Sequence, residues 1–233
     1  MQAVTSANQP WHTASLVALD LEGSGAQERD DEQILEIAAI RLVDGRPDMA
    51  TAYTTCLDPG RPIPAKPWIS PGLAGLALQG QPAFTDIRDD LLTRLQGTHL
   101  VGHNVGVDWR LLHRHLPELA LAGLIDTYRL AKATDLNGKL GLTDLLARLQ
   151  LTGAVTTAAP ASRPHRALWD TTGAALLLPT LIRQHFTSEP TLQQLLDVAG
   201  IPTTPPTAAP TATPSTPANQ GGPYQDRCFR LFG

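Results

Sequence analysis

Short apolar runs separated by turn residues make up the first quarter of the chain. The run SLVALDL at 15–21 has the length and composition of a buried strand. Two further apolar runs occupy 34–43 and 49–57, and Asp44-Gly45 between them is a strong signal for a hairpin turn. The pattern therefore predicts three antiparallel strands.

After a proline-rich loop, the spacing of apolar positions becomes helical. Within 84–97, Ile87, Leu91 and Leu95 share one helix face, and Gly97 is a good C-terminal stop. We further predict a strand at 98–103, a short strand running into a helix over 123–132, a loop at 152–162, and helices over 107–119, 142–151 and about 164–186. Three strands come first, and the later strands alternate with helices. This order indicates an α/β fold, with a mixed five-stranded sheet flanked by helices.

The composition changes abruptly after Ile201. Residues 202–223 are mostly Pro, Thr, Ala and Gly, which cannot bury enough apolar area to offset the entropy of ordering. We therefore predict an N-terminal extension at 1–14, one folded domain at 15–201, a disordered linker at 202–223 and an apolar C-terminal peptide at 224–233.

Length and charge narrow the class of protein. The chain has 233 residues, 42% of them hydrophobic, enough for one substantial core. It has no apolar stretch long enough to cross a bilayer and no signal sequence, so we expect no membrane association and a cytoplasmic location. Cys56 and Cys228 are too few for a disulfide framework or a structural zinc site. A net charge of -4 excludes a broad basic surface that coats nucleic acid.

The first candidate site residues follow the first strand. Asp20 and Glu22 are two positions apart, so both carboxylates project from the same face of a strand. They repel each other unless a cation lies between them. Gly23 and Gly25 come next, and glycine allows a ligand to approach the backbone closely. The alternative interpretation is an acidic strand end in contact with solvent.

Two later segments carry residues of the same kind. One strand ends at His103-Asn104, and Asp108 falls in the first turn of the next helix, where a carboxylate also suits the helix dipole. In PHRALWDTTGAALLL at 164–178, Asp170 has apolar neighbours, which is unfavourable for a lone charge. His165 lies at the start of this helix, where a capping or packing role is the alternative.

In combination these residues resemble the three motifs of the DEDDh, or DnaQ-like, exonuclease family. The resemblance rests on Asp20-x-Glu22, on Asn104 with Asp108, and on His165-Arg166-Ala167-Leu168-x-Asp170, and it extends from about Ser15 to Phe186. The family includes the epsilon proofreading subunit of bacterial DNA polymerase III, ribonuclease T and oligoribonuclease. This chain departs from the common pattern in having Gly23-Ser24-Gly25 for Thr-Thr-Gly and Val107 for an aromatic residue.

The resemblance implies a ribonuclease H-like fold and a site for two Mg²⁺ or Mn²⁺ ions. It assigns Asp20, Glu22 and Asp170 to the metal on the nucleophile side, and Asp20 with Asp108 to the second metal. His165 would be the general base, since an imidazole with a pKa near 6.5 suits neutral pH. Gly23 and Asn104 are the expected substrate-binding residues.

The implied activity is hydrolysis of phosphodiester bonds from the 3′ ends of single-stranded or frayed DNA, in replication proofreading or repair. The motifs are equally compatible with a 3′-5′ exoribonuclease, because sugar discrimination depends on contacts near the 2′ position. A third interpretation is a catalytically silent module that binds nucleic acid.

The C-terminal peptide has its own resemblance. Phe229, Leu231 and Phe232 fall where bacterial peptides that bind the sliding clamp place their apolar anchors, and Asp226 occupies the usual glutamine position. A flexible tether ending in such anchors would raise the effective concentration of the domain near its partner. We therefore expect a sliding clamp or a polymerase subunit as partner; a tail that packs on its own domain is the alternative.

Overall fold

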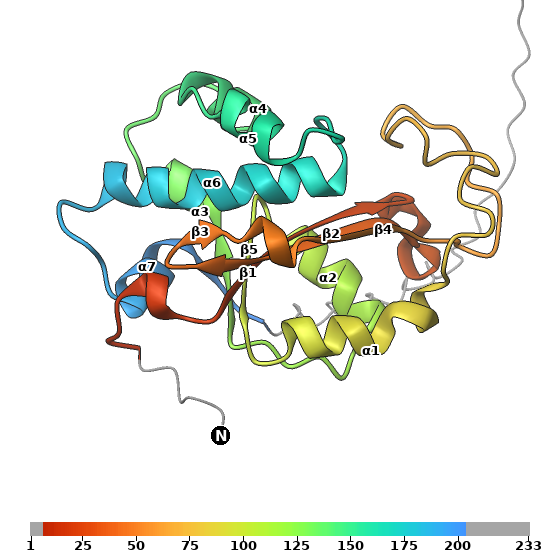
Figure 1. The fold of residues 1–233 in the computed structure, drawn as a ribbon, viewed down its shortest axis with the longest axis horizontal. Helices are drawn as coiled ribbons and strands as arrows, with labels where there is room; N and C mark the ends of the chain where they lie inside the picture. The colour runs from red at the N-terminus through yellow and green to blue at the C-terminus, as the bar shows by residue number, and fades with distance from the viewer. Residues whose placement is uncertain (1–6, 204–233) are drawn as a thin grey trace, which may run out of the picture.

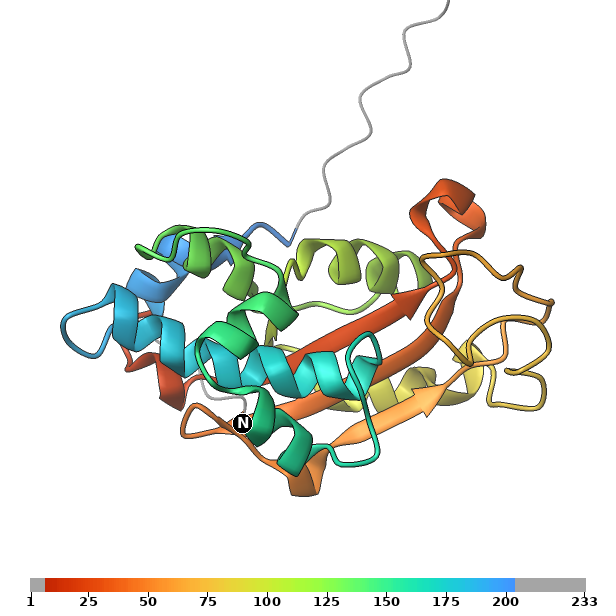
Figure 2. The same cartoon turned by 90° about the horizontal axis from the view of Figure 1, so that it is seen from above.

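A single mixed sheet lies between two layers of helices in the computed structural model, which describes residues 7–203 (Figure 1, Figure 2). The strands lie in the order β3-β2-β1-β5-β6-β7, and β4 also pairs with β2. Strands β1, β5 and β6 are parallel, whereas β2 and β7 run antiparallel to their neighbours. The strands are β1 (Leu16–Gly23), β2 (Ile34–Val43), β3 (Arg46–Pro47), β4 (Tyr53–Cys56), β5 (His99–Gly102), β6 (Gly123–Asp126) and β7 (Gly200–Ile201).

The helices divide between two core clusters. Apolar side chains of α1 and α2 join one cluster, and those of α3 to α7 join the other. Helix α6 runs across its face of the sheet, opposite α1 and α2 (Figure 1). The helices are α1 (Phe84–Leu95), α2 (Gly106–His115), α3 (Thr127–Lys132), α4 (Leu142–Arg148), α5 (Thr152–Ala158), α6 (Ala167–His185) and α7 (Leu192–Ala199), with short 3-10 turns at Trp11–Thr13, Ala26–Asp31 and Met49–Thr51.

The alternation of side chains along β1 directs the acidic pair towards α6. Leu16 and Ala18 belong to the cluster that contains α6, whereas Val17 and Leu19 belong to the cluster of α1 and α2. Successive side chains of a strand point to opposite faces. Asp20 and Glu22 therefore continue the row of Leu16 and Ala18 and project on the α6 side of the sheet.

All five predicted strands are present, with differences at the hairpin. Asp44 and Gly45 have φ values of 50° and 71°, the pair of positive angles that a mirror-image hairpin turn requires. The returning arm is the two-residue strand β3, because Asp48 then accepts a hydrogen bond from the backbone N–H of Ala50 and starts a 3-10 turn. The strand predicted at 49–57 is consequently confined to β4. Strands β3 and β7 are too short to produce a period-two pattern.

Two helices differ from the sequence-based expectation. The loop predicted at 152–162 was wrong for residues 152–158, which form α5. Glycine and threonine there disfavour a helix locally, but burial of Val155 in the α6 cluster stabilises it. Helix α7 was not predicted; Thr191 and Gln194 form a capping box at its start.

The segment 58–82, which we call the wall loop, has a small core of its own. Ile63, Leu73 and Leu78 are buried in a cluster with Leu35 of β2. The wall loop lies at the end of the sheet where α6 begins, and both views agree on this placement (Figure 1, Figure 2). An irregular segment is thereby anchored to the strand next to β1.

The predicted linker at 202–223 and the C-terminal peptide at 224–233, with Phe229, Leu231 and Phe232, lie outside the described residues except at 202–203. Within the predicted N-terminal extension, Trp11 and Ala14 are buried in the α6 cluster. In the described part of the chain, no helix has both the length and the apolar character that crossing a membrane requires.

Candidate active site

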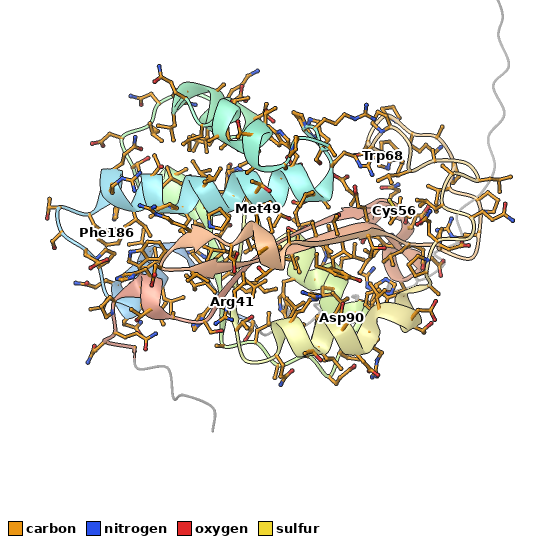
Figure 3. The ribbon with its side chains drawn as sticks, viewed as in Figure 1. Arg41, Met49, Cys56, Trp68, Asp90 and Phe186 are labelled. Atoms are coloured by element: carbon orange, nitrogen blue, oxygen red, sulfur yellow. The ribbon has the colours of Figure 1, made fainter. Side chains whose placement is uncertain are left out.

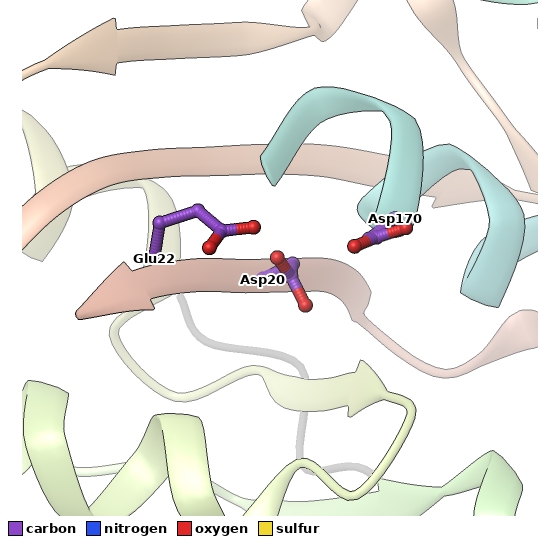
Figure 4. Close-up of side chains that lie close together, drawn as sticks. All are labelled: Asp20, Glu22 and Asp170. Carbon is purple, nitrogen blue, oxygen red and sulfur yellow. The ribbon is translucent and has the colours of Figure 1, made fainter. Parts of the chain in front are cut away.

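Three carboxylates from two distant parts of the chain meet at the end of β1. Carboxylate oxygens of Asp20, Glu22 and Asp170 all lie within 4.8 Å of one another (Figure 4). Asp20 and Glu22 come from β1, and Asp170 comes from the first turn of α6, which packs over the same face of the sheet. The predicted convergence of these three residues is therefore present in the fold.

The electrostatics of this cluster favour protonation when no cation is bound. Burial raises the pKa of Asp20 well above its usual value, and the charges of Asp108, Asp170 and Glu22 raise it further. Burial raises the pKa of Glu22 to about 7, opposed by a hydrogen bond from Ser70. Burial likewise raises the pKa of Asp170 to about 7, opposed by a hydrogen bond from the backbone N–H of His165. A bound cation would remove this penalty.

Asp108 lies beside the three-carboxylate cluster without belonging to it. It occupies the first turn of α2 and is buried, and its Oδ1 accepts a hydrogen bond from the backbone N–H of Leu21 at 3.1 Å. Burial raises the pKa of Asp108 to about 8, opposed by the hydrogen bonds from Leu21 and from its own N–H. The carboxylate thus holds the residue between Asp20 and Glu22.

His165, Asp20 and Asp170 share a cavity of about 440 Å³. Its lining comprises Asp20, His103, Gly141, Leu142, Thr143, Asp144, His165 and Asp170. His165 precedes α6 and has φ = 63°, in the left-handed region that non-glycine residues rarely occupy. Its charge lowers the pKa of Glu22. The structure therefore brings the predicted general base to the acidic cluster.

Neighbouring parts of the fold constrain both predicted substrate-binding residues, Gly23 and Asn104. A Cβ atom on Gly23 would lie 3.1 Å from Leu111 and 3.2 Å from Glu32, so a side chain there would crowd α2. Asn104 is exposed with φ = 66°, and its backbone N–H donates to Asp126 Oδ1 at 2.7 Å. Substrate contacts at Gly23 and Asn104 remain predictions.

Sequence reasoning assigned no role to two polar residues that touch the site. The hydroxyl of Ser70, in the wall loop, donates to Glu22 Oε2 at 2.9 Å. Glu36, on β2, is buried and pairs with Arg166. A glutamate inside the apolar run ILEIAAI was a usable signal for the second residue. Nothing in the local sequence marks Ser70, because a loop of this length has no predictable position.

The donor set fits a hard divalent cation. Asp20, Glu22 and Asp170 offer only carboxylate oxygens, which Mg²⁺ and Mn²⁺ prefer over nitrogen or sulfur ligands. The raised pKa values of Asp20, Glu22 and Asp170 reflect like charges held together in a partly buried site. We conclude that the residues present suit a divalent metal.

The sequence of the chain is similar to that of known exonucleases. Residues 17–178 match the RNase_T family model, described as Exonuclease. The chain is 31% identical over 108 residues to the DNA polymerase III subunit epsilon-like protein of Rhodobacter capsulatus, covering 46% of this chain and 15% of that protein. It is 29% identical over 158 residues to DNA polymerase III subunit epsilon of Rickettsia conorii, covering 61% of this chain and 68% of that protein.

A solved structure has the same fold. Exonuclease X, in complex with 5′ overhanging duplex DNA, superposes with a TM-score of 0.59 at 23% sequence identity, covering 77% of this chain and 98% of that one. The sheet order and the helix layers define the class, a ribonuclease H-like α/β domain. The match over residues 17–178 goes further: the chain belongs to the RNase_T exonuclease family. The predicted fold and the predicted DnaQ-like relationship are confirmed.

Proposed function

We propose that this exonuclease-family hydrolase removes nucleotides from the 3′ ends of DNA in a metal-dependent reaction. The observation that carries the proposal is the meeting of Asp20, Glu22 and Asp170 within 4.8 Å, with Asp20 and Asp170 on the cavity that His165 also lines. Phosphodiester hydrolysis needs an activated water and neutralisation of charge on the attacking and leaving oxygens. Clustered carboxylates with an adjacent imidazole supply the residues for both requirements.

We propose two Mg²⁺ or Mn²⁺ ions as cofactors. Asp20, Glu22 and Asp170 would hold one ion, and Asp20 with Asp108 the other. When bound, such ions supply Lewis-acid activation of water and stabilise charge on the phosphate. Asp108 also fixes the end of β1 through the N–H of Leu21, and Ser70 orients Glu22. These contacts keep the ligand oxygens aligned before substrate arrives.

His165 acts as the general base in this scheme. The oxygen of the attacking water forms a bond to phosphorus, its proton passes to the imidazole of His165, and the bond to the 3′ oxygen of the preceding nucleotide breaks. The position of His165 before the first turn of α6 leaves its ring at the cavity rather than in the helix core. Asp20 and Asp170 line the same cavity and face this proton transfer.

The choice of DNA rests on the relatives. Two of them are named as DNA polymerase III epsilon or epsilon-like subunits, and the structural neighbour was solved with duplex DNA. We therefore propose a role in proofreading or repair. There are two alternatives. The substrate is RNA, or the domain binds nucleic acid without hydrolysing it.

The deciding experiment uses end-labelled DNA and RNA oligonucleotides of one sequence, each with Mg²⁺, Mn²⁺ or EDTA. We expect a 5′-labelled DNA strand to shorten stepwise with either metal and to stay intact in EDTA. Preferential digestion of RNA would replace DNA by RNA as the substrate, and mononucleotide release from the 5′ end would refute the polarity. No cleavage with either metal would indicate a silent module. An Asp20→Asn preparation controls for contaminating nucleases.

We also propose that the C-terminal peptide recruits the domain to a sliding clamp or a polymerase subunit. Only the sequence of Phe229, Leu231 and Phe232 supports this. Titration of a purified bacterial clamp with a fluorescent peptide of residues 223–233 should give saturable binding that alanine at Leu231 and Phe232 abolishes. Absence of binding at high micromolar concentration would discard the clamp as partner.

A further inference from the structure

A partly buried ion pair joins β2 to the residue that follows His165. Arg166 Nε donates to Glu36 Oε2 at 2.7 Å, and Arg166 Nη2 donates to Oε1 at 2.8 Å. The backbone N–H of Ala167 donates to the same Oε2 at 3.3 Å. Both oxygens of Glu36 are therefore engaged by the two residues that lead into α6. We call this arrangement the Glu36–Arg166 fork.

Glu36, the acidic member of the fork, lies next to a site that is already acidic. Glu36 lies directly opposite Glu22 in the β1–β2 register, and its charge raises the pKa of Asp20, Glu22 and Asp170. A buried ion pair is usually no more stabilising than apolar side chains of the same volume, because both charges lose their hydration. Stability is therefore a weak explanation for a glutamate inside the apolar run ILEIAAI.

The backbone next to the fork is in an unfavourable conformation. His165 has φ = 63°, and a non-glycine residue keeps such an angle only where its surroundings impose it. The fork holds the chain on the C-terminal side of His165. On the N-terminal side of His165, its backbone N–H lowers the pKa of Asp170, so this N–H faces the first turn of α6. The anchor on β2 thus lies directly next to this histidine in the chain.

We propose that Glu36 and Arg166 are positioning residues that hold His165 in its left-handed conformation, with its ring at the cavity. This inference rests on the proposed function, since it acts through the general base. Arg166 contacts β2 rather than the cavity lining, so it neither touches the reacting atoms nor binds the metal. The bidentate geometry is essential, because a lysine at position 166 would keep the charge and lose the planar fork.

A double-mutant cycle tests whether Arg166 acts through His165. Arg166→Ala should lower kcat on a single-stranded oligonucleotide by ~10-fold or more and leave KM within ~3-fold. In the His165→Ala background the same change should cost no more than ~2-fold, because the group it positions is already gone. Arg166→Lys and Glu36→Gln should each reproduce most of the kcat loss.

Arg114→Ala is the matched control. Arg114 pairs with Glu32 at 3.5 Å, and the exposed fractions of the two side chains, 29% and 7%, resemble the 24% and 7% of Arg166 and Glu36. Arg114 is on α2 and outside the acidic cluster. Its removal should lower the melting temperature by an amount comparable to that for Arg166→Ala and leave kcat unchanged.

Three results would overturn the proposal. One is an equal loss of kcat in both backgrounds, which would mean that Arg166 acts independently of His165. Another is a loss confined to KM, which would make Arg166 a substrate contact. The third is full kcat in Arg166→Ala. If Arg166→Ala does not fold, Arg166→Lys and Glu36→Gln are combined with His165→Ala and judged by the same criteria. An inactive wild type refutes the proposed function itself, whereas an active wild type with an additive cycle refutes only this inference.

Discussion

At the scale of single residues, the clustering of three carboxylates affects both cation binding and the stability of the metal-free protein. Asp20, Glu22 and Asp170 are close enough to share a cation, and their pKa values are raised because burial and mutual repulsion disfavour three negative charges. Function and stability are therefore opposed at these positions in the metal-free protein. Two predictions at this scale test the proposed general base, His165, and a proposed metal ligand, Asp20, separately.

The first prediction concerns the imidazole of His165. His165→Ala should fold normally and lose ~10²-fold or more in kcat, as expected when a general base is removed. The measurement is steady-state digestion of a labelled oligonucleotide with saturating Mg²⁺. His185→Ala, at the far end of α6 and partly exposed, is the control and should retain full activity. Near wild-type kcat in the His165 variant would assign that residue a packing role.

The second prediction concerns charge repulsion between Asp20 and the other carboxylates of the cluster. Asp20→Asn should abolish Mg²⁺-dependent cleavage and raise the melting temperature of the metal-free protein at pH 8, because it removes a partly buried charge next to two others. A gain of ~3 °C or more is expected for a domain of this size. Thermal unfolding in EDTA measures it. A lower melting temperature than wild type would show that repulsion at the site is not a destabilising force.

At the scale of elements, the wall loop contributes both order and exposed apolar surface beside the site. Its buried residues pack on Leu35, Ser70 reaches Glu22, and Arg163 donates to the carbonyl of Pro71 at 3.2 Å. Trp68 lies in the same loop (Figure 3). Its exposed fraction is 53%, and a Cβ atom on Gly25 would lie 2.6 Å from its indole nitrogen. An aromatic ring is thus held next to the end of β1.

We expect Trp68 to stack on a base of the bound strand. Trp68→Ala should raise KM for an oligonucleotide by ~5-fold or more, since stacking of a base on an aromatic side chain is worth about 1–3 kcal/mol. Trp68→Phe should recover most of the affinity. Hydrolysis of a small nitrophenyl ester of thymidine monophosphate, which lacks neighbouring bases, should be unaffected. Unchanged KM in Trp68→Ala would rule out the contact.

At the scale of the whole molecule, the acidic cluster couples folding to pH and to metal. The pKa values of Glu22 and Asp170 near 7 and of Asp108 near 8 lie above the value of about 4 for an unfolded carboxyl, so the folded state binds more protons in between. Stability of the metal-free protein therefore falls as pH rises through this window and levels off above the folded pKa values.

This linkage predicts opposite effects of pH on the free and metal-bound protein. In EDTA, the melting temperature of the wild-type protein, compared with that of Asp20→Asn, should be higher at pH 6 than at pH 8.5. Addition of millimolar Mg²⁺ should stabilise the protein more at pH 8.5, because the metal competes with protons for the same oxygens. Calorimetry at the two pH values, with Asp20→Asn as reference, measures both effects. Equal Mg²⁺ stabilisation of Asp20→Asn and wild type would contradict the assignment of Asp20 as a ligand.

The local sequence was sufficient for much of this molecule. Buried strands and amphipathic helices are recognisable because their apolar periodicity follows from backbone geometry, and Asp44-Gly45 marked its turn because few residues accept positive φ. The acidic residues were recognisable because charges next to apolar strands are rare without a reason. Asp20, Glu22, His165 and Asp170 could be named as candidates before any distance was known, because together they resemble the motifs of the DnaQ-like family.

Other features depend on packing between distant segments, which no local pattern encodes. Helix α5 forms because Val155 is buried under α6, against the preference of its own residues. Ser70 reaches Glu22 because the wall loop packs on Leu35, and Glu36 meets Arg166 across 130 positions of the chain. Sequence by itself determined which groups are candidates for the chemistry, since the motifs depend on residue type and spacing. Only the tertiary structure decided how they are held, because burial, pKa shifts and hydrogen bonds depend on neighbours in space.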